Sequence, residues 1–372
     1  MAFLGLSRKV KNTFSHYGSS VTNKNYQEAR RRIKEAAKNQ ATSLSLADLK
    51  LKTLPPELYQ LTHLQSLDLD NNKLRQLRPE LTRLTRLQSL DLSGNQLIKL
   101  SPEIGLMSNL QYLYLSRNQL RSLPAEIGPL RKLEWLNLDS NQLITLPPEI
   151  GQLTHLERLL LGSNQLQKLP SEVGRLSNLR TLRLGHNQLS ELPPELGQLT
   201  NLQRLYLTNN QLRHVLPEIC QLKELVSLGL DINDLSIVPP EIGRLSKLHT
   251  LHLGGNHLEH LPSQIGQLSS LQTLGLSGNP LAKLPPEIGH LTSLKKLYVS
   301  RTLIQELPVE MANLTRLERL DLTDNDYLYL IPDQVFDWEP AEIIEYILAS
   351  QQEFDSPKPI LRAHPVMMPL AA

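Results

Sequence analysis

Asparagine recurs every 23 residues along this chain of 372 residues, always within the frame Leu-x-x-Leu-x-Leu-x-x-Asn-x-Leu. A fixed period of this length predicts an array of one repeated unit rather than a compact globule. Because a buried amide needs partners for its donors and its acceptor, we expect each asparagine to bond backbone groups of neighbouring units at a bend. This structural ladder consists of Asn72, Asn95, Asn118, Asn141, Asn164, Asn187, Asn210, Asn233, Asn256, Asn279 and Asn325.

Thirteen units follow from this phase, the first beginning at Ala41 and the last at Leu317. Leu49 holds the asparagine site of the first unit, as expected of an atypical terminal repeat. Thr302 holds it in the twelfth unit, where a hydroxyl can make only part of the bonds of an amide. We therefore predict a local weakness or a slight kink at Thr302.

Within each unit, apolar and polar residues alternate over segments such as 66–70, which predicts a short strand with one buried face. Proline and glycine follow, as in 147–151, and predict a tight turn with at most one short helical turn. Stacked units then place parallel strands side by side along an inner surface. The predicted fold class is an α/β solenoid, a horseshoe with a parallel concave sheet, short turns or helical turns on the convex side and helical caps at both ends.

Both ends of the array need caps, because a lone repeat buries too little apolar surface to offset the cost of ordering it. At the front, Asn25 to Glu28 reads as a capping box that opens a helix, with Tyr26, Ala29 and Ile33 on its apolar side. At the back, Pro340 suits the first turn of a second helix. We divide the chain into a loose basic segment (1–22), an N-terminal capping helix (23–40), thirteen repeats (41–339), a C-terminal capping helix (340–353) and a flexible tail (354–372).

The unit seen without fault from Leu133 to Leu153 closely resembles the 23-residue class of intracellular leucine-rich-repeat proteins. That class includes scaffolds that bind Ras-type GTPases, plant intracellular Ras-group proteins and the repeat arms of Roco proteins. The resemblance implies a non-catalytic module that binds a protein partner on its concave face, in intracellular signalling or complex assembly. The flanking helices also look like those that bracket a Roco repeat domain, so a detached Roco-type recognition arm associated with a small GTPase is an alternative.

The repeat phase shows which side chains each strand turns toward solvent on the concave face. Solvent-facing Trp, Tyr and Arg are the residue types enriched in binding hot spots, and they cluster here over five consecutive repeats. The predicted partner-binding residues are Tyr112, Tyr114, Trp135, Asn137, Asp139, Arg158, Arg183, His186, Arg204 and Tyr206. The competing explanation is that the aromatic residues only stabilise the sheet by stacking across neighbouring strands.

Other functions receive less support from the sequence. No phosphate-binding loop, H-E-x-x-H or G-x-S-x-G motif occurs, so we expect no catalytic residues and no cofactor. Four histidines between His249 and His260 fall on both sides of the predicted bend, which argues against a metal site. Basic residues on the concave face alternate with aspartates such as Asp68 and Asp91, which argues against nucleic-acid binding. Cys220 occupies a repeat position held elsewhere by glycine, so we interpret it as structural.

The cellular location is an expectation from the absence of targeting signals. The first residues lack the pattern of a secretory signal, and no apolar run approaches the ~18 residues of a membrane span, so we expect a cytoplasmic protein. We also expect a monomer. The expected partner is a protein, such as a small GTPase or a signalling enzyme. A further alternative is a membrane-surface adaptor anchored by a basic amphipathic N-terminus. That anchor would use Phe3, Leu6, Val10 and Phe14 with Arg8, Lys9 and Lys11.

Overall fold

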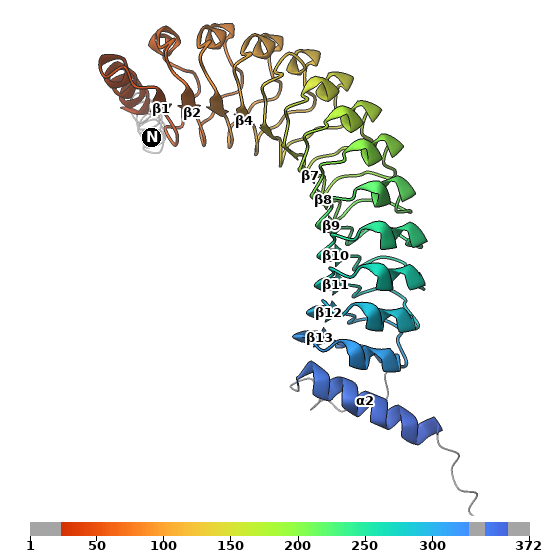
Figure 1. The fold of residues 1–372 in the computed structure, drawn as a ribbon. Coiled ribbons are helices and arrows are strands. Elements are labelled where there is room, and N and C mark those ends of the chain that lie inside the picture. Colours follow the sequence, from red (N-terminus) through yellow and green to blue (C-terminus); the bar gives the residue numbers. More distant parts are fainter. Residues whose placement is uncertain (1–23, 327–338, 356–372) are drawn as a thin grey trace, which may run out of the picture.

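The computed structural model describes residues 24–326 and 339–355. Its strands pair in chain order as one parallel, open sheet that lines the inner side of a curved arc (Figure 1). This is the predicted solenoid. The strands are β1 (Ser43–Ser45), β2 (Ser66–Asp68), β3 (Ser89–Asp91), β4 (Tyr112–Tyr114), β5 (Trp135–Asn137), β6 (Arg158–Leu160), β7 (Thr181–Arg183), β8 (Arg204–Tyr206), β9 (Ser227–Gly229), β10 (Thr250–His252), β11 (Thr273–Gly275), β12 (Lys296–Tyr298) and β13 (Arg319–Asp321).

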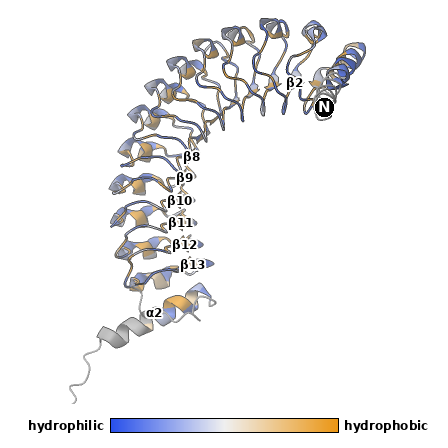
Figure 2. Cartoon of the chain, turned by 180° about the vertical axis from the view of Figure 1, so that it is seen from behind, coloured by the Kyte–Doolittle hydropathy of each residue, from blue (hydrophilic) through white to orange (hydrophobic). Residues whose placement is uncertain are grey.

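Each repeat unit forms one turn of the solenoid, which we call a coil. The strands stay in register because every coil has the same length. Each strand residue pairs with the residue one period later, as Leu113 does with Leu136. The central leucine of nearly every strand is buried, so the leucines stack into one continuous core inside the coils. Hydrophobic segments consequently recur from coil to coil along the arc (Figure 2). The residues on either side of the central leucine point to the concave surface, as the alternation predicts.

The convex side carries a short 3-10 turn in twelve coils. Proline often begins the turn, where its missing N–H would have no partner anyway. The residue after the turn closes it, as the Leu153 N–H does by donating to the Ile150 carbonyl at 3.2 Å. The turns are η1 (Pro56–Gln60), η2 (Pro79–Arg83), η3 (Pro102–Leu106), η4 (Ala125–Ile127), η5 (Pro148–Gln152), η6 (Ser171–Arg175), η7 (Pro194–Gln198), η8 (Pro217–Gln221), η9 (Pro240–Arg244), η10 (Ser263–Gln267), η11 (Pro286–His290) and η12 (Val309–Asn313).

The ladder asparagines join consecutive coils, and Asn141 shows the bonding pattern. Its Nδ2 donates to the Leu115 carbonyl of the preceding coil at 2.9 Å and to the Leu138 carbonyl of its own coil at 3.0 Å. Its Oδ1 accepts the Leu120 N–H at 3.0 Å. The residue just before the ladder position has positive φ in coil after coil, as Ser140 does at 58°. The chain therefore bends sharply there. The asparagine amide forms hydrogen bonds with the backbone N–H and C=O groups that the bend leaves without partners.

The ladder changes at Thr302, which is buried like the asparagines. Its hydroxyl donates to Oδ1 of Asn325 at 2.7 Å, and the Val299 carbonyl lies within hydrogen-bond distance of the same hydroxyl at 3.2 Å. In the described part of the chain, however, the buried Leu281 N–H has no acceptor, although its counterpart Leu258 donates to Asn279 at 3.1 Å. An unsatisfied buried N–H is costly, which gives the predicted weakness at Thr302 a physical cause.

Helices lie at both ends of the described array (Figure 1). The first is helical over 24–38 and packs Ala29, Ile33 and Ala36 onto the first coil. Asn25 already lies inside this helix, so the predicted capping box is wrong, since its residues belong to helical turns rather than to the helix start. The second, α2 (Pro340–Asp355), packs against η12, buries Ile343 and Ile344, and extends two residues past the predicted end at 353.

Candidate binding face on the concave sheet

The predicted binding residues lie on, or directly after, the five consecutive strands β4 to β8. The parallel register arranges the side chains on either side of the central leucines in two rows. One row runs Tyr112, Trp135, Arg158, Thr181 and Arg204. The other runs Tyr114, Asn137, Leu160, Arg183 and Tyr206. Asp139 and His186 follow β5 and β7 at the bend. We call these two rows together with Asp139 and His186 the concave face.

Two members of these rows, Thr181 and Leu160, were missed by the sequence analysis. Leu160 belongs to a run of three leucines, in which the inward residues are hard to separate by type alone. Counting the repeat phase from Asn164 would have identified it, because the phase fixes orientation whatever the residue is. Leu160 places an apolar side chain in the row between Asn137 and Arg183.

An aromatic and cationic cluster occupies the N-terminal half of the concave face. The rings of Tyr114 and Trp135 meet edge to face, with centroids 5.6 Å apart. The Arg158 guanidinium lies 4.4 Å from the centre of the Trp135 ring, within the range of a cation–π contact. The Trp135 indole N–H is buried and has no acceptor among the described residues. The tyrosine hydroxyl of Tyr112 donates to Glu134 at 3.0 Å.

A second, polar cluster lies at the bend after β5 and β7. One carboxylate oxygen of Asp139 accepts the Gly162 N–H at 2.6 Å, and the other lies 3.2 Å from Arg183. Burial raises the pKa of Asp139, an effect that Arg183 and the Gly162 N–H oppose. A side chain at Gly162 would bring its Cβ to 3.0 Å from the Asp139 oxygen, so only glycine leaves this contact undisturbed. His186 is bonded to Asn209 at 2.8 Å.

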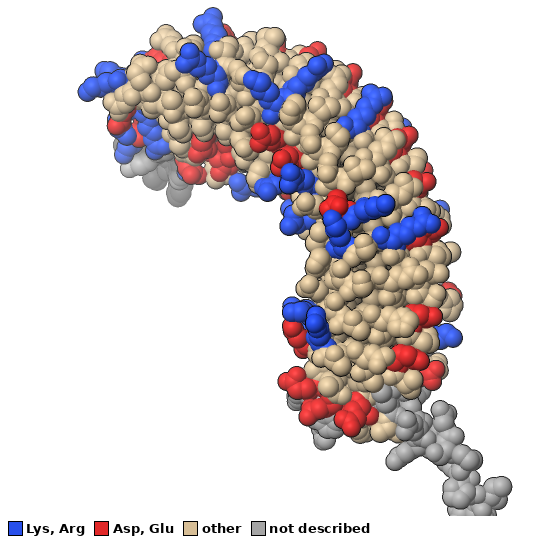
Figure 3. All heavy atoms as spheres, viewed as in Figure 1, with Lys and Arg blue, Asp and Glu red and all other residues tan. Residues whose placement is uncertain are grey.

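Charge varies along the concave edge of the arc (Figure 3). Asp68, Asp70 and Asp91 gather near the N-terminal end, where burial and the nearby Asp91 raise the pKa of Asp70. Arg117 lies 3.3 Å from Asp70. The arginines of β6 to β8 follow at the middle of the arc. The next strands, β9 to β11, carry neither Lys nor Arg, and basic residues return at β12 and β13.

Ile232 is a strained residue at the C-terminal border of the concave face. It precedes the ladder residue Asn233 and has φ 54°, a conformation that disfavours a β-branched side chain. The equivalent positions of the next two coils are Gly255 and Gly278, which adopt positive φ without this penalty. Ile232 is also 56% exposed, so burial does not offset the strain.

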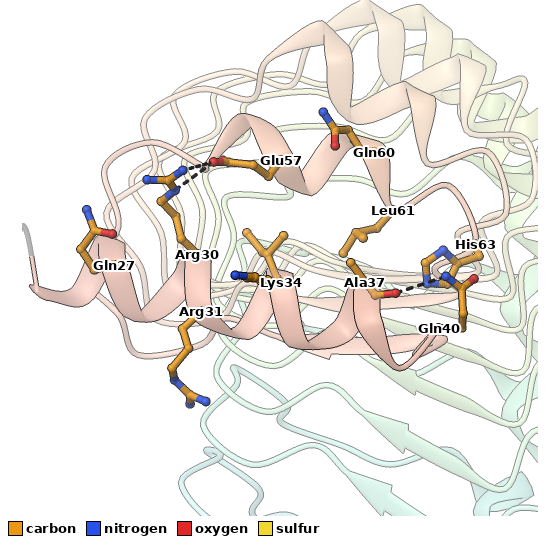
Figure 4. Close-up of a pocket in the computed structure, with 11 residues that line it drawn as sticks. Gln27, Arg30, Arg31, Lys34, Ala37, Gln40, Glu57, Gln60, Leu61 and His63 are labelled. Atoms are coloured by element: carbon orange, nitrogen blue, oxygen red, sulfur yellow. Dashed lines mark hydrogen bonds and ion pairs between the residues drawn. The ribbon is translucent and has the colours of Figure 1, made fainter.

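A pronounced hollow lies elsewhere, between the N-terminal helix and the first coil (Figure 4). Its volume is about 690 Å³, with Ile33, Ala37 and Leu61 among the residues that line it. Arg30 and Glu57 bridge one side of it at 2.8 Å. The sequence analysis did not predict this hollow, because it arises from the packing of the helix on η1 rather than from a motif.

The other described residues that could act as a nucleophile or bind a metal ion do not come together at one site. Cys220 is buried in η8, and burial raises the pKa of its thiol to about 12. The part of the chain that the structure describes holds no group of three or more His, Cys, Asp or Glu side chains placed to bind a metal ion. None of the helices in residues 24–326 and 339–355 has the length and apolarity needed to cross a membrane.

Comparison with known proteins identifies the repeats. A family described as "Leucine rich repeat" matches residues 39–97, 85–143 and 154–218, and one described as "Leucine-rich repeat region" matches 236–335. No curated protein sequence matches the chain.

Solved structures resemble about three quarters of the chain. A leucine-rich-repeat protein of Leptospira interrogans is 42% identical over 74% of this chain and 70% of its own, with a TM-score of 0.72. A plant peptide hormone receptor solved with the peptide RGF2 is 34% identical over 76% of this chain and 48% of its own, with a TM-score of 0.67. An internalin of Listeria monocytogenes, 23% identical over 77% of this chain and 82% of its own, shares the fold with a TM-score of 0.70. The chain belongs to the leucine-rich-repeat proteins.

Proposed function

We propose that this chain is a non-catalytic interaction module that binds a protein partner on its concave face, over β4 to β8. The observation that carries the proposal is the concentration of Tyr, Trp and Arg side chains in two registered rows on five adjacent strands. These residue types dominate binding hot spots when they share one surface. Among the similar structures, the plant receptor is solved in complex with a peptide, which agrees with partner binding by such repeats.

Sheet stabilisation alone explains these side chains less well. The buried leucines and the asparagine ladder continue through coils that carry only small residues on the concave side, such as Gly229 and Gly275. Those coils remain in the same register without aromatic stacking. Register in this sheet therefore does not require aromatic stacking, which favours a role in recognition for the cluster around Trp135.

The proposal also includes the cellular location, the kind of partner and the alternative roles of the chain. We place the module in cytoplasmic signalling or complex assembly, with a small GTPase or a signalling enzyme as the kind of partner. A detached Roco-type arm would use the same face, so partner identification decides between them. The proposed membrane anchor, from Phe3 to Phe14, lies outside the described residues, and flotation on anionic liposomes with and without residues 1–22 tests it.

The double substitution Trp135→Ala with Arg183→Ala tests the use of the concave face. We expect it to abolish capture of the main partner while leaving the circular-dichroism spectrum unchanged, because both side chains are at least partly exposed. Quantitative affinity capture with crosslinking measures the loss and identifies the partner. The matched control is Arg175→Ala with Gln198→Ala, two exposed residues of the convex turns η6 and η7.

Equal recovery of the same partner by the folded double variant and by wild type would remove the proposal. Loss of the partner in the convex control as well would place the contact elsewhere on the surface. A photo-crosslinking residue at Tyr206, compared with one at Gln198, locates the contact independently of affinity.

A further inference from the structure

We propose that the partner presents an acidic, extended segment to three arginines of the concave face, Arg158, Arg183 and Arg204. This inference rests on the proposed function and specifies the chemistry of the partner. The three arginines come from the consecutive strands β6, β7 and β8. All three side chains reach solvent on the same side of the sheet.

The register sets the spacing of these arginines. Arg158 and Arg204 occupy the same row, with Thr181 of β7 between them. Parallel strands lie about 4.8 Å apart, so their backbones are roughly 10 Å from each other. Arg183 lies in the other row on the intervening strand, roughly 8 Å from each in a straight line. Alternate side chains of an extended peptide repeat at about 7 Å, so two successive acidic side chains can reach Arg183 and either Arg158 or Arg204.

The charge of this arginine group is incompletely balanced by the protein itself. Arg183 has a carboxylate partner, Asp139, which is also bonded to the Gly162 N–H. Arg158 instead covers the ring of Trp135. The Arg204 side chain is exposed, and its guanidinium has neither an ion pair nor a hydrogen bond within the described residues. A guanidinium binds a carboxylate with two parallel hydrogen bonds, so the group is suited to a segment that supplies carboxylates.

The surroundings limit where the acidic segment can lie. Toward the N-terminus, Asp68, Asp70 and Asp91 repel it, so its acidic part does not extend over β2 and β3 (Figure 3). Toward the C-terminus, β9 to β11 offer no lysine or arginine on the concave side. Basic residues return at β12 and β13, but Asp321 of β13 and Asp324, which pairs with Arg301 at 2.9 Å, place carboxylates among them. Electrostatic complementarity therefore favours β6 to β8 for the acidic segment.

Binding of synthetic peptides tests this inference on the full chain. The probes are three fluorescein-labelled peptides of about eight residues, long enough to cross the five strands of the concave face. Threonine alternates with Asp in the first peptide, with Asn in the second and with Lys in the third. Fluorescence anisotropy gives the dissociation constant of each peptide for wild type, Arg204→Gln and Trp135→Ala.

We expect the Asp peptide to bind, and the Asn and Lys peptides to bind at least tenfold more weakly. Arg204→Gln removes one charged contact and should weaken the Asp peptide about tenfold. Raising salt from about 50 mM to about 300 mM should weaken it several-fold further. The matched control is Arg213→Gln, an exposed arginine beyond the ladder position of the same coil, which should leave the affinity unchanged.

The outcomes separate this inference from the proposed function. If the Asp and Asn peptides bind equally and both weaken in Trp135→Ala, the concave face binds peptides but the acidic specificity is overturned. If peptides bind and neither Trp135→Ala nor Arg204→Gln changes their affinity, the concave face is not the binding surface and both proposals fail. If the Asp peptide shows no binding, the inference is wrong as well.

Discussion

Thr302 shows what a single ladder residue contributes. An asparagine at this site satisfies a carbonyl of its own coil, a carbonyl of the preceding coil and an N–H of that same preceding coil, as Asn279 does with Leu276, Leu253 and Leu258. The threonine hydroxyl donates to Asn325 of the next coil at 2.7 Å, with the Val299 carbonyl at 3.2 Å, and leaves the Leu281 N–H without an acceptor among the described residues. Fewer ladder hydrogen bonds therefore join the twelfth coil to the eleventh than join the eleventh coil to the tenth.

We predict that Thr302→Asn stabilises the protein by about 1 to 2 kcal/mol, because it supplies the acceptor that the buried Leu281 N–H lacks. Urea denaturation followed by circular dichroism measures the change as a higher midpoint. Thr292→Asn is the control, since Thr292 is exposed and outside the ladder. A midpoint for Thr302→Asn at or below wild type would show that the hydroxyl already suffices.

The N-terminal helix depends on apolar packing rather than on the predicted capping box. It covers the first coil with Ala29, Ile33 and Ala36, whereas Asn25 lies within the helix rather than at its N-cap. Without this helix, buried residues of the first coil such as Leu46 and Leu58 would meet water. End coils of a solenoid have only one neighbour, so the stability of the cap limits fraying of the array.

Ile33→Ala tests this role of the helix. Ile33 is 2% exposed, and its truncation should cost about 2 to 5 kcal/mol in the first coil and its cap. Hydrogen exchange should report the loss as faster exchange in β1 and the helix, with β8 to β12 unaffected. Lys34→Ala, at the next and exposed position, should change neither. Uniform destabilisation of all coils would contradict a local, nearest-neighbour cap.

The elements also show how far the sequence predicts this protein. The 23-residue period predicts the strands, their order and their register, because one unit repeated at constant length can stack in only one way. It also predicts which side of each strand faces inward. Side-chain contacts between coils, such as Arg158 over Trp135 or Arg183 with Asp139, depend on rotamers and could not be predicted. The predicted capping box of the N-terminal helix is wrong, because Asn25 to Glu28 matches the capping pattern although Asn25 is already helical.

At the scale of the whole molecule, each coil contacts mainly the coils before and after it. The concave face occupies β4 to β8, and the coils of β9 to β11 present mostly small residues beside it. A partner larger than a short peptide would meet an acidic zone, a basic zone, the strands β9 to β11 without Lys or Arg, and charged residues again at β12 and β13, in this order along the arc (Figure 3). The repeat number of each coil therefore sets the position of its side chains along the concave surface.

Deletion of residues 225–247 tests this modular organisation. The deletion removes one complete unit, including β9, and joins Glu224 to Leu248 in the same repeat phase. We expect a folded protein with an unchanged circular-dichroism signal per residue, an arc shorter by about 4.8 Å in small-angle scattering, and retained partner capture, because β4 to β8 remain intact. Deletion of residues 225–236 is the control, since half a unit shifts leucines out of the core and should unfold the adjacent coils. If the two deletions behave alike, the coils are not exchangeable units and the assignment of binding to an independent group of strands fails.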